Sequence, residues 1–279
     1  MTMSRAYDLP CRTTSRGWRQ GSLGIFNWWK AACVILLFCA ATAIAARAQT
    51  FTTLVDFDDV LTSGGEPNAL VQGIDGNLYG TTFIGGYYGA GTFFKITPNG
   101  TLTTLHSFDL MDGSNPEAAL VQATSGDFYG TTGEGGANGD GTVFRITPSG
   151  KLTTLHSFDG TDGSNPDAAL IQATNGDLYG TTEYGGAIGY GTVFSLSEGL
   201  GPFVETQPTS GKVGACVNIL GTNLTGATSV SFDGTAAVFK VVSSSLIMAT
   251  VPAGATTGKV QVVTPSGTLT SNVAFRVTP

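Results

Sequence analysis

A repeat of fifty residues dominates the middle of the chain and most constrains its fold. Residues 92–141 and 142–191 align without a gap and are identical at 36 of 50 positions by direct count. A more diverged copy begins part-way through the unit at Phe51 and contains the sequence GNLYGTTFIGGYYGAG at residues 76–91. A period of about 50 residues is typical of supersecondary units that stack or repeat around an axis. The sequence therefore predicts one structural unit present about three times.

Each unit has the pattern of four short β-strands. In the last complete copy, the predicted strands are residues 142–147, 151–158, 168–174 and 177–182. Turn sequences separate them: Ser149-Gly150, DGSNP at residues 162–166, and Asn175-Gly176. Glycine and asparagine accept the positive φ angles that such turns need. No stretch shows helical periodicity, and 40 glycines in 279 residues fit a turn-rich, all-β chain.

Four strands per unit of this length predict a β-propeller blade of the kelch size. The repeat region starts at the second strand of a unit, and residues 192–197 add a first strand after the last complete unit. The two ends of the region could thus share a blade. Propellers typically have about four to eight blades, so three arrangements stay open: an open arc, an oligomer that completes a ring, or a compact threefold barrel like a β-trefoil. We favour about three propeller-like blades and leave their closure open.

The signature GDLYGTTEYGGAIGYGTVF at residues 176–194 recurs in variant form in each copy. It resembles the tandem repeat called GloVer, which is found in exported bacterial proteins. The resemblance covers about residues 51–200. That family has no established activity, so the resemblance implies no catalytic residues.

Residues 1–48 are interpreted as an export signal. Basic residues with a single acid, Asp8, precede an uncharged apolar run at residues 31–46, and Ala46-Arg47-Ala48 supplies small residues at the two positions that a signal peptidase reads. The run is shorter than the roughly twenty residues of a membrane-spanning helix. We therefore expect cleavage before Gln49, no membrane span afterwards, and a secreted protein that is extracellular, periplasmic or held at the cell surface.

The charge of the remaining chain excludes nucleic acid as a partner. Without residues 1–48 the chain carries 7 basic and 19 acidic side chains, a net charge of -12. Such a chain repels phosphate backbones. Cys216 is then the remaining cysteine, so we expect no internal disulfide in the processed chain and a small apolar strand residue at this position.

The composition changes after residue 200, and residues 203–279 show about seven short strands with alternating polarity, as in an Ig-like sandwich. Val217 and Ile219 alternate with Cys216 and Asn218, which predicts a strand with one buried face. The run QPTSGKVGACVNILGTNL, followed by VSFDG, VPAGATTGKVQVVTPSG and FRV, is similar to the IPT/TIG family of Ig-like domains. That resemblance implies a spacer, oligomerisation or interaction module without a catalytic motif. The predicted organisation is a signal peptide (1–48), a repeat domain (49–200) and an Ig-like domain (201–279).

Candidate chemical groups mostly have a structural interpretation. His106 and His156 share a repeat position that holds Val55 in the first copy, so we predict packing roles, and neighbours in HSFD alternate faces and cannot form a Ser/His/Asp triad. The acidic segments at residues 109–117 and 159–167 depart from the calcium-loop spacing and are predicted to be turns, with weak calcium binding as the alternative. No other metal or cofactor is expected.

The Gly-rich stretches contain no lysine and precede no helix, which excludes nucleotide binding. We predict that their glycines turn the chain between the last strand of one blade and the first strand of the next.

Seven of the positions that vary among the Gly-rich stretches form the candidate ligand-binding set: Tyr87, Tyr88, Glu134, Asp140, Glu183, Tyr184 and Tyr190. Tyrosines beside carboxylates suit stacking on sugar rings and hydrogen bonding to their hydroxyls. The other interpretation is that tolerated loop positions drift.

We therefore predict an exported, non-catalytic repeat protein, with no catalytic residues, that binds polysaccharide or a cell-surface protein and uses the Ig-like domain as a spacer or interaction module. The alternatives are a carbohydrate-active enzyme or accessory subunit, and a purely structural, shortened repeat protein. For the enzyme, Glu134, Asp140 and Glu183 are the loop acids to nominate, and nothing in the sequence brings a pair of them together.

Overall fold

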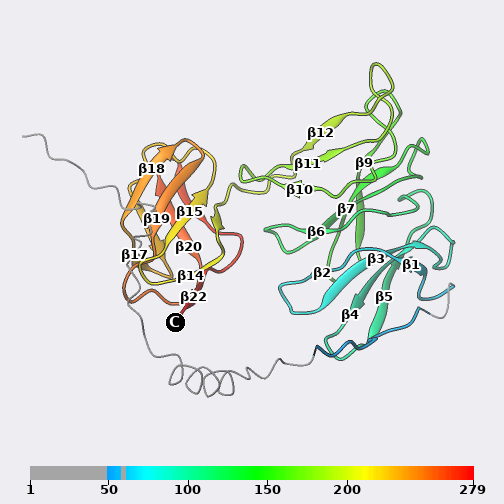
Figure 1. The fold of residues 1–279 in the computed structure, drawn as a ribbon. Coiled ribbons are helices and arrows are strands. Elements are labelled where there is room, and N and C mark those ends of the chain that lie inside the picture. The colour runs from blue at the N-terminus through cyan, green and yellow to red at the C-terminus, as the bar shows by residue number, and fades with distance from the viewer. Residues whose placement is uncertain (1–48, 58–60) are drawn as a thin grey trace, which may run out of the picture. The chain divides into compact units, whose positions relative to one another are not determined.

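The computed structural model describes residues 49–57 and 61–279, so the predicted export signal lies outside the described residues. All regular secondary structure in the described part is β-strand, which confirms the all-β prediction. Within that part, no helix is long and apolar enough to cross a membrane. The repeat region and the C-terminal region each form their own antiparallel sheets (Figure 1).

The repeat region forms three sheets, which we call blades 1, 2 and 3. The strand order is β2-β3-β4-β5 in blade 1, with β1 also paired to β3, β6-β7-β8-β9 in blade 2, and β10-β11-β12 in blade 3 (Figure 1). Blade 1 contains β1 (Gly65–Pro67), β2 (Val71–Gln72), β3 (Leu78–Ile84), β4 (Thr92–Ile96) and β5 (Leu102–Ser107). Blade 2 contains β6 (Val121–Gln122), β7 (Phe128–Thr132), β8 (Thr142–Ile146) and β9 (Leu152–Ser157). Blade 3 contains β10 (Ile171–Gln172), β11 (Leu178–Thr181) and β12 (Val193–Leu196).

A blade does not coincide with one sequence unit. The last two predicted strands of one unit pair with the first two of the next, so that β7 lies beside β8 with Thr132 opposite Thr142. The Thr132 and Thr142 hydroxyls are 2.8 Å apart and close the base of the loop between them. The Gly-rich stretches are therefore hairpin loops inside a blade, and the prediction that they connect successive blades is wrong. The DGSNP segments make that connection.

One predicted strand is much shorter than expected. Of residues 168–174, only Ile171 and Gln172 form ladder pairs, with Tyr179 and Leu178 of β11. The corresponding strands β2 and β6 also have two residues. In blades 2 and 3 the Gln side chain of this strand reaches the preceding blade: Gln122 Oε1 accepts the Ile74 N–H at 2.9 Å, and Gln172 Oε1 accepts the Thr124 N–H at 3.0 Å. These bonds join each short strand to the turn that follows the short strand of the preceding blade.

Apolar cores that contain several aromatic residues lie between successive blades. Between blades 1 and 2, the ring centroids of Tyr79 and Phe93 lie 4.4 Å and 5.8 Å from that of Phe128. Between blades 2 and 3, the buried core contains Tyr129, Val143, Phe158, Leu170 and Leu178. Each blade is thus stabilised by its neighbour and not by its own sheet alone.

The glycine of the repeated YGTT sequence is required by this packing. In β7, a Cβ atom added to Gly130 would lie 2.6 Å from Phe144 Cζ and 2.7 Å from Leu120 Cδ2. Gly180 is crowded in the same way by Phe194 and Leu170. The absence of a side chain lets the ring of the next strand lie across the backbone.

The C-terminal region forms two four-stranded sheets, β13-β15-β19-β18 and β17-β16-β20-β21, and a parallel pair, β14-β22. The strands are β13 (Glu205–Gln207), β14 (Ser210–Lys212), β15 (Cys216–Leu220), β16 (Ser229–Phe232), β17 (Thr235–Ala236), β18 (Phe239–Ser243), β19 (Leu246–Thr250), β20 (Val260–Thr264), β21 (Gly267–Thr270) and β22 (Arg276–Thr278). One apolar cluster, centred on Phe232, Ile247 and Phe275, joins them. The architecture is the predicted Ig-like sandwich.

Strand β15 has the predicted alternation. Val217 and Ile219 are buried, whereas Cys216 and Asn218 are exposed. Cys216 is disulfide-bonded in the structure. The expectation of no internal disulfide concerns the chain without residues 1–48 and stays a prediction.

Candidate functional site

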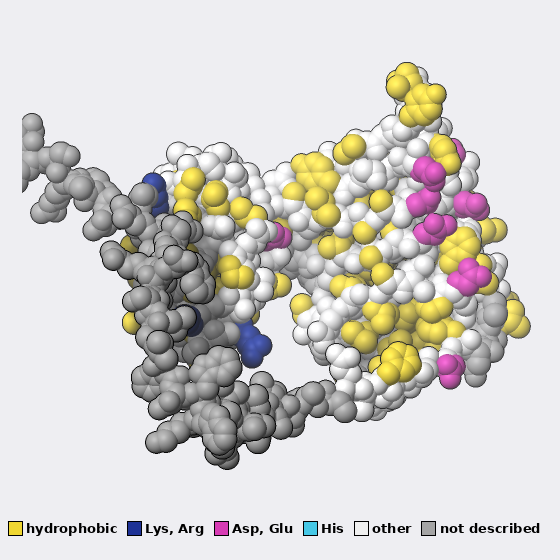
Figure 2. All heavy atoms as spheres, in the orientation of Figure 1, with side chains coloured by type: hydrophobic (Ala, Val, Ile, Leu, Met, Phe, Trp, Pro, Cys, Tyr) yellow, Lys and Arg dark blue, Asp and Glu magenta, His cyan; other side chains and the backbone are white. Residues whose placement is uncertain are grey.

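The Gly-rich loops and the DGSNP segments interleave at one end of the blades. Asn115, in the segment between blades 1 and 2, donates its N–H to the Ala90 carbonyl and accepts the Gly133 N–H, both at 3.0 Å. Asn165 repeats this arrangement one blade later, between Asp140 and Glu183. We call residues 83–91, 109–117, 133–141, 159–167 and 183–191 the loop rim. Acidic side chains gather along one edge of the repeat region, next to exposed hydrophobic ones (Figure 2).

The asparagine of each DGSNP segment has a local conformational reason. Asn115 and Asn165 have φ angles of 55° and 52°, in the left-handed region that asparagine tolerates better than most residues. The proline that follows favours an extended or turn conformation at that point. This geometry aims the asparagine N–H and C=O at the loops on either side, so the segment joins two blades.

Each histidine pairs with the aspartate six residues later. The Nε2 atoms of His106 and His156 lie 2.7 Å from Oδ2 of Asp112 and Asp162, respectively. The other oxygen of Asp112, Oδ1, accepts the Asp109 N–H at 3.0 Å. The His106 ring also stands edge-on to Phe108, with centroids 5.3 Å apart. The histidines thus pack against aromatic rings, as predicted. Through their aspartates they also stabilise the turn that follows the last strand of the blade. The pair leaves no periodic signal in the sequence, because its two residues lie six positions apart across a turn.

The aspartates of these segments are occupied by the turn itself. Asp109 Oδ1 accepts the N–H groups of Met111 and Asp112 at 3.0 Å, and Asp159 Oδ1 accepts that of Thr161 at 2.9 Å. Among the residues that the structure describes, no group of three or more His, Cys, Asp or Glu side chains is arranged to hold a metal ion. The hydrogen bonds support the turn interpretation, and calcium binding stays a prediction.

A group of four acidic side chains belongs to the loop rim: Glu117, Glu134, Asp167 and Glu183. Burial, together with the negative charges of Glu117, Glu183 and Glu134, raises the pKa of Asp167 to about 6. Its Oδ1 atom is buried and accepts no hydrogen bond within the described part of the chain. The structure therefore brings Glu134 and Glu183 into one electrostatic environment, which the sequence alone could not show, and adds Glu117 and Asp167 to it.

The remaining predicted site residues fall into separate places on the loop rim. Tyr184 adjoins the acidic group. Its hydrogen bond to Glu183 and the negative charge of Glu183 raise the pKa of Tyr184. Tyr87 and Tyr88 contact each other edge-to-face, with centroids 4.8 Å apart. Tyr190 is exposed, and Asp140 is held through its backbone carbonyl by the Asn165 N–H. The fold therefore brings together three of the predicted site residues: Glu134, Glu183 and Tyr184.

Replacement of Asp167 by Asn tests this acidic group. The ordinary pKa of the carboxyl is 3.8 and its value in the folded protein is about 6, so the folded state holds a proton that the unfolded state has released between those values. Stability contributed by this site therefore falls as the pH rises from about 4 to about 6 and is constant above. We expect Asp167→Asn to raise the free energy of unfolding at pH 7 by about 1 kcal/mol, allowing for solvent screening, and to leave it unchanged at pH 3.5. Urea unfolding at both pH values, with Glu66→Gln as the control, measures this, and equal effects at the two pH values would contradict it.

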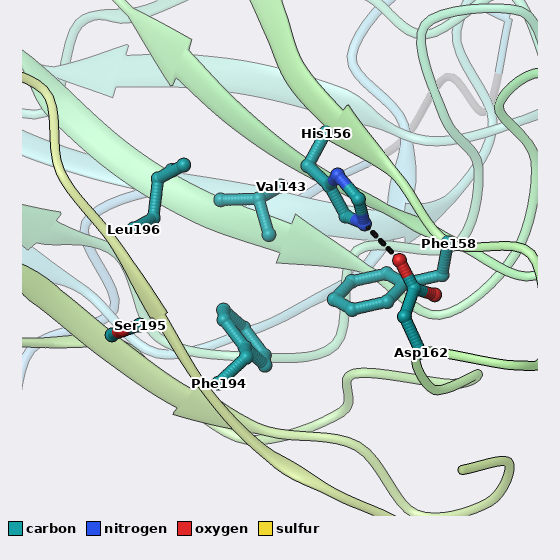
Figure 3. Close-up of a pocket in the computed structure, with 7 residues that line it drawn as sticks. All are labelled: Val143, His156, Phe158, Asp162, Phe194, Ser195 and Leu196. Atoms are coloured by element: carbon teal, nitrogen blue, oxygen red, sulfur yellow. Dashed lines mark hydrogen bonds and ion pairs between the residues drawn. The ribbon is translucent and has the colours of Figure 1, made fainter. Parts of the chain in front are cut away.

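A pocket of about 220 Å³ lies where blade 2 meets blade 3 (Figure 3). Its lining comes from β8, β9 and β12 and the segment after β9: Val143, His156, Phe158, Asp162, Phe194, Ser195 and Leu196. The pocket contains the residue types of a hydrolase triad, but the hydrogen bond drawn in Figure 3 joins His156 only to Asp162, and Ser195 lies on the opposite side. The arrangement resembles an incompletely filled blade interface more than a catalytic centre.

Comparison with known families identifies both parts of the chain. The family model of the Gloeobacter/Verrucomicrobia repeat matches residues 42–236. The chain belongs to this repeat family. The IPT/TIG domain model matches residues 203–277, which confirms both resemblances seen in the sequence. A search of curated proteins gave no match.

Two solved structures are similar to this chain at low scores. A gluconolactonase from Xanthomonas campestris matches with a TM-score of 0.34 and 15% identity, over 72% of this chain and 61% of that one. The extracellular domain of a hybrid two-component system protein from B. thetaiotaomicron matches with a TM-score of 0.35 and 14% identity, over 75% of this chain and 30% of that one. The chain thus spans less than two thirds of either protein. These scores are too low to bear on fold or function.

Proposed function

We propose that this chain is an exported, non-catalytic binding protein whose loop rim binds a neutral polysaccharide, with the Ig-like domain as a spacer or interaction module. The observation that carries the proposal is the exposed ring of Tyr184 with its hydrogen bond to Glu183, one of the four acidic side chains of the loop rim. An exposed aromatic ring next to hydrogen-bond acceptors is the combination that sugar rings and their hydroxyls require.

The charge of the loop rim narrows the class of ligand. The negative charges of Glu117, Glu134 and Glu183 all act on Asp167, and the chain without residues 1–48 has a net charge of -12. Anionic polymers would be repelled from such a surface. Neutral polysaccharides, and amino sugars carrying positive charge, are compatible with it.

A carbohydrate-active enzyme is the second candidate, and one observation favours it. Asp167, with a pKa near 6, would be partly protonated near neutral pH, beside carboxylates with which it could share acid and base roles. Glycoside hydrolysis needs one carboxylic acid and one carboxylate in this way. Asp167 lies partly below the surface of the rim, however, and its buried oxygen faces protein. Binding without hydrolysis therefore remains the main proposal.

The combined substitution Tyr184→Ala with Tyr190→Ala tests the binding role. Each exposed ring would contribute about 0.5–1.5 kcal/mol by stacking, so we expect the dissociation constant for the bound polysaccharide to rise roughly tenfold or more. The measurement is affinity electrophoresis of the exported protein against neutral, amino-sugar and acidic polysaccharides, in calcium and in chelator.

The control for this experiment is Val238→Ala, which removes an exposed apolar side chain from the Ig-like domain. Unchanged affinity in the double tyrosine variant, or binding to none of the polysaccharides, would refute the rim as the binding surface. Loss of binding in chelator would assign a role to calcium. Release of reducing ends from any polymer, abolished by Glu183→Gln, would favour the enzyme instead.

A further inference from the structure

The outer flank of blade 3 exposes residues whose counterparts are buried in the other blades. Val193 is 79% exposed, whereas the equivalent residues Val143 and Phe93 are 1% and 0% exposed. Likewise Thr181 is exposed, whereas Thr131 is buried. The difference arises because Phe93 packs against blade 2 and Val143 against blade 3, while no blade formed by the described residues covers Val193. This flank therefore exposes the kinds of residue that elsewhere form the interface with the next blade.

Blade 3 also has three strands, and not four, in the described part of the chain. In blade 2, the edge of β8 pairs with β9, and the Phe158 N–H donates to the Gly141 carbonyl at 3.0 Å. Phe108 and Gly91 make the same bond in blade 1. The equivalent edge of blade 3 is β12, which pairs only with β11 in the described residues. Backbone groups along β12, and the carbonyl of Gly191, are left available for an added strand.

The segment at the opposite end of the repeat region has the sequence of the missing strand. Residues 51–57 align with 102–108 and 152–158, which contain β5 and β9, yet they belong to no sheet. Phe57 packs edge-on to Phe94 with centroids 5.1 Å apart, as Phe108 packs on Phe144 at 5.2 Å. Residues 54–57 thus already lie against blade 1 where the fourth strand of a preceding blade would lie.

The flank of blade 1 beside this segment is the matching half of the interface. Leu70 is 50% exposed, whereas its equivalents Leu120 and Leu170 are 6% and 3% exposed and belong to the cores between blades. Leu70 lines a cavity of about 290 Å³ together with Leu54 and Phe57. Within residues 49–57 and 61–279, one end of the repeat region therefore has no preceding blade, and the other has neither a fourth strand nor a following blade.

Hydrogen bonds at the ends of β5 and β9 also support the pairing of residues 51–57 with β12. The N–H groups of Tyr87 and Ala137 donate to the hydroxyls of Ser107 and Ser157, at the ends of β5 and β9, both at 3.3 Å. The third residue at this repeat position is Ala187, in the Gly-rich loop of blade 3. Asp56 occupies the serine position in residues 51–57, and its carboxylate can accept the Ala187 N–H when the segment adds to β12.

We propose that two copies of the chain join end to end into a closed six-bladed ring, in which residues 51–57 of each copy add to β12 of the other. By analogy with β8 and β9, Phe51, Thr52 and Thr53 lie opposite Leu196, Ser195 and Phe194. Phe51 then fills the side of the pocket lined by Leu196. Tyr179 and Val193 of one copy pack against Leu70 of the other.

The number of copies follows from the blade count. A chain whose own ends met would bury Leu70 and Val193 against each other, but both are exposed. Two copies give six blades, within the range of about four to eight that propellers adopt, whereas three copies give nine. Head-to-tail contacts that close after two copies form a symmetric dimer, and contacts that do not close form a filament.

The oligomeric state of the exported protein tests this interface directly. We expect light scattering with size-exclusion chromatography to give twice the mass of one chain, and Val193→Lys to raise the dimer dissociation constant at least tenfold, because lysine at an edge strand opposes pairing. The matched control is Ile188→Lys, an exposed apolar residue of the same blade whose counterparts Tyr88 and Asn138 are also exposed. Circular dichroism should show both variants folded, since neither side chain is buried in one chain. A wild-type monomer at high concentration, or a dimer unaffected by Val193→Lys, would overturn the proposal.

A cysteine pair tests the register and distinguishes a second copy from self-closure. Opposed residues of antiparallel strands have Cα atoms about 4.5–5.5 Å apart, which is within disulfide range, so Thr52→Cys with Ser195→Cys should give a covalent dimer on mild oxidation. The pair Thr53→Cys with Ser195→Cys, one residue out of register, should cross-link at least tenfold less. The wild-type chain oxidised in parallel controls for Cys216. A cross-linked monomer, or a ladder of higher oligomers, would overturn the closed dimer.

Discussion

Replacing Phe144 by alanine should lower the free energy of unfolding of the repeat region by about 3–5 kcal/mol, the usual cost of emptying a buried phenylalanine site. Phe144 is fully buried between blades 1 and 2. Its ring packs edge-on to Phe108, with centroids 5.2 Å apart, and lies across Gly130. Because the surrounding strands are held in two separate sheets, they can close only part of the space that the ring leaves. Urea denaturation followed by circular dichroism measures the loss.

The control for this substitution is Phe144→Leu, which keeps an apolar side chain in the site and should cost less than about 1.5 kcal/mol. The Ig-like domain has its own core, so its unfolding should not change in either variant. A loss below about 1 kcal/mol for Phe144→Ala would mean that the aromatic core between blades does not stabilise the repeat region.

The second large effect is expected for Gly141→Ala, at the end of the Gly-rich loop of blade 2. Gly141 has a φ angle of 94°, where an L-residue is strained by about 1–2 kcal/mol. An added Cβ would also collide with the Thr132 carbonyl and lie 2.7 Å from Pro166 Cδ. Strain and overpacking together should lower the free energy of unfolding by about 3 kcal/mol or more.

Gly139→Ala separates the two causes. Gly139 is in the same loop with a φ angle of 89°, but nothing lies within 4 Å of an added Cβ. We expect this variant to lose only the strain, about 1–2 kcal/mol. Thermal unfolding of both variants measures the difference, and equal losses would show that the contact with the Thr132 carbonyl is unimportant.

These two predictions concern residues that recur in every copy, whereas the proposed binding residues differ between copies. Phe94, Phe144 and Phe194 repeat, as do Gly91, Gly141 and Gly191, because each blade needs the same contact with its neighbour. Glu134 and Glu183 with Tyr184 interrupt that regularity on the loop rim. In the proposed ring, two such rims would belong to one particle, which would increase apparent affinity for a repeating polymer through multivalency.

Part of the candidate site was predictable and part was not. The sequence nominated Glu134, Glu183 and Tyr184 because they vary within a constant loop. It did not nominate Glu117 and Asp167, which appeared only as turn residues beside proline. It also missed the pairing of His106 with Asp112, since a hydrogen bond across a turn leaves no periodic signal. Side chains from different loops meet through the packing of blades, and this information is not local in the sequence.

The sequence by itself determined the all-β class, the strand content of the repeat and the Ig-like region, because these depend on local alternation, turn residues and self-similarity. Only the tertiary structure decided how strands group into blades. A repeat can be divided into units at any position, so the sequence left open whether β7 and β8 form a hairpin within one blade or connect two blades. The contact between Thr132 and Thr142 shows that they form a hairpin within one blade. The exposure of Val193 and Leu70 was likewise hidden in the sequence, since it depends on which blade lacks a neighbour.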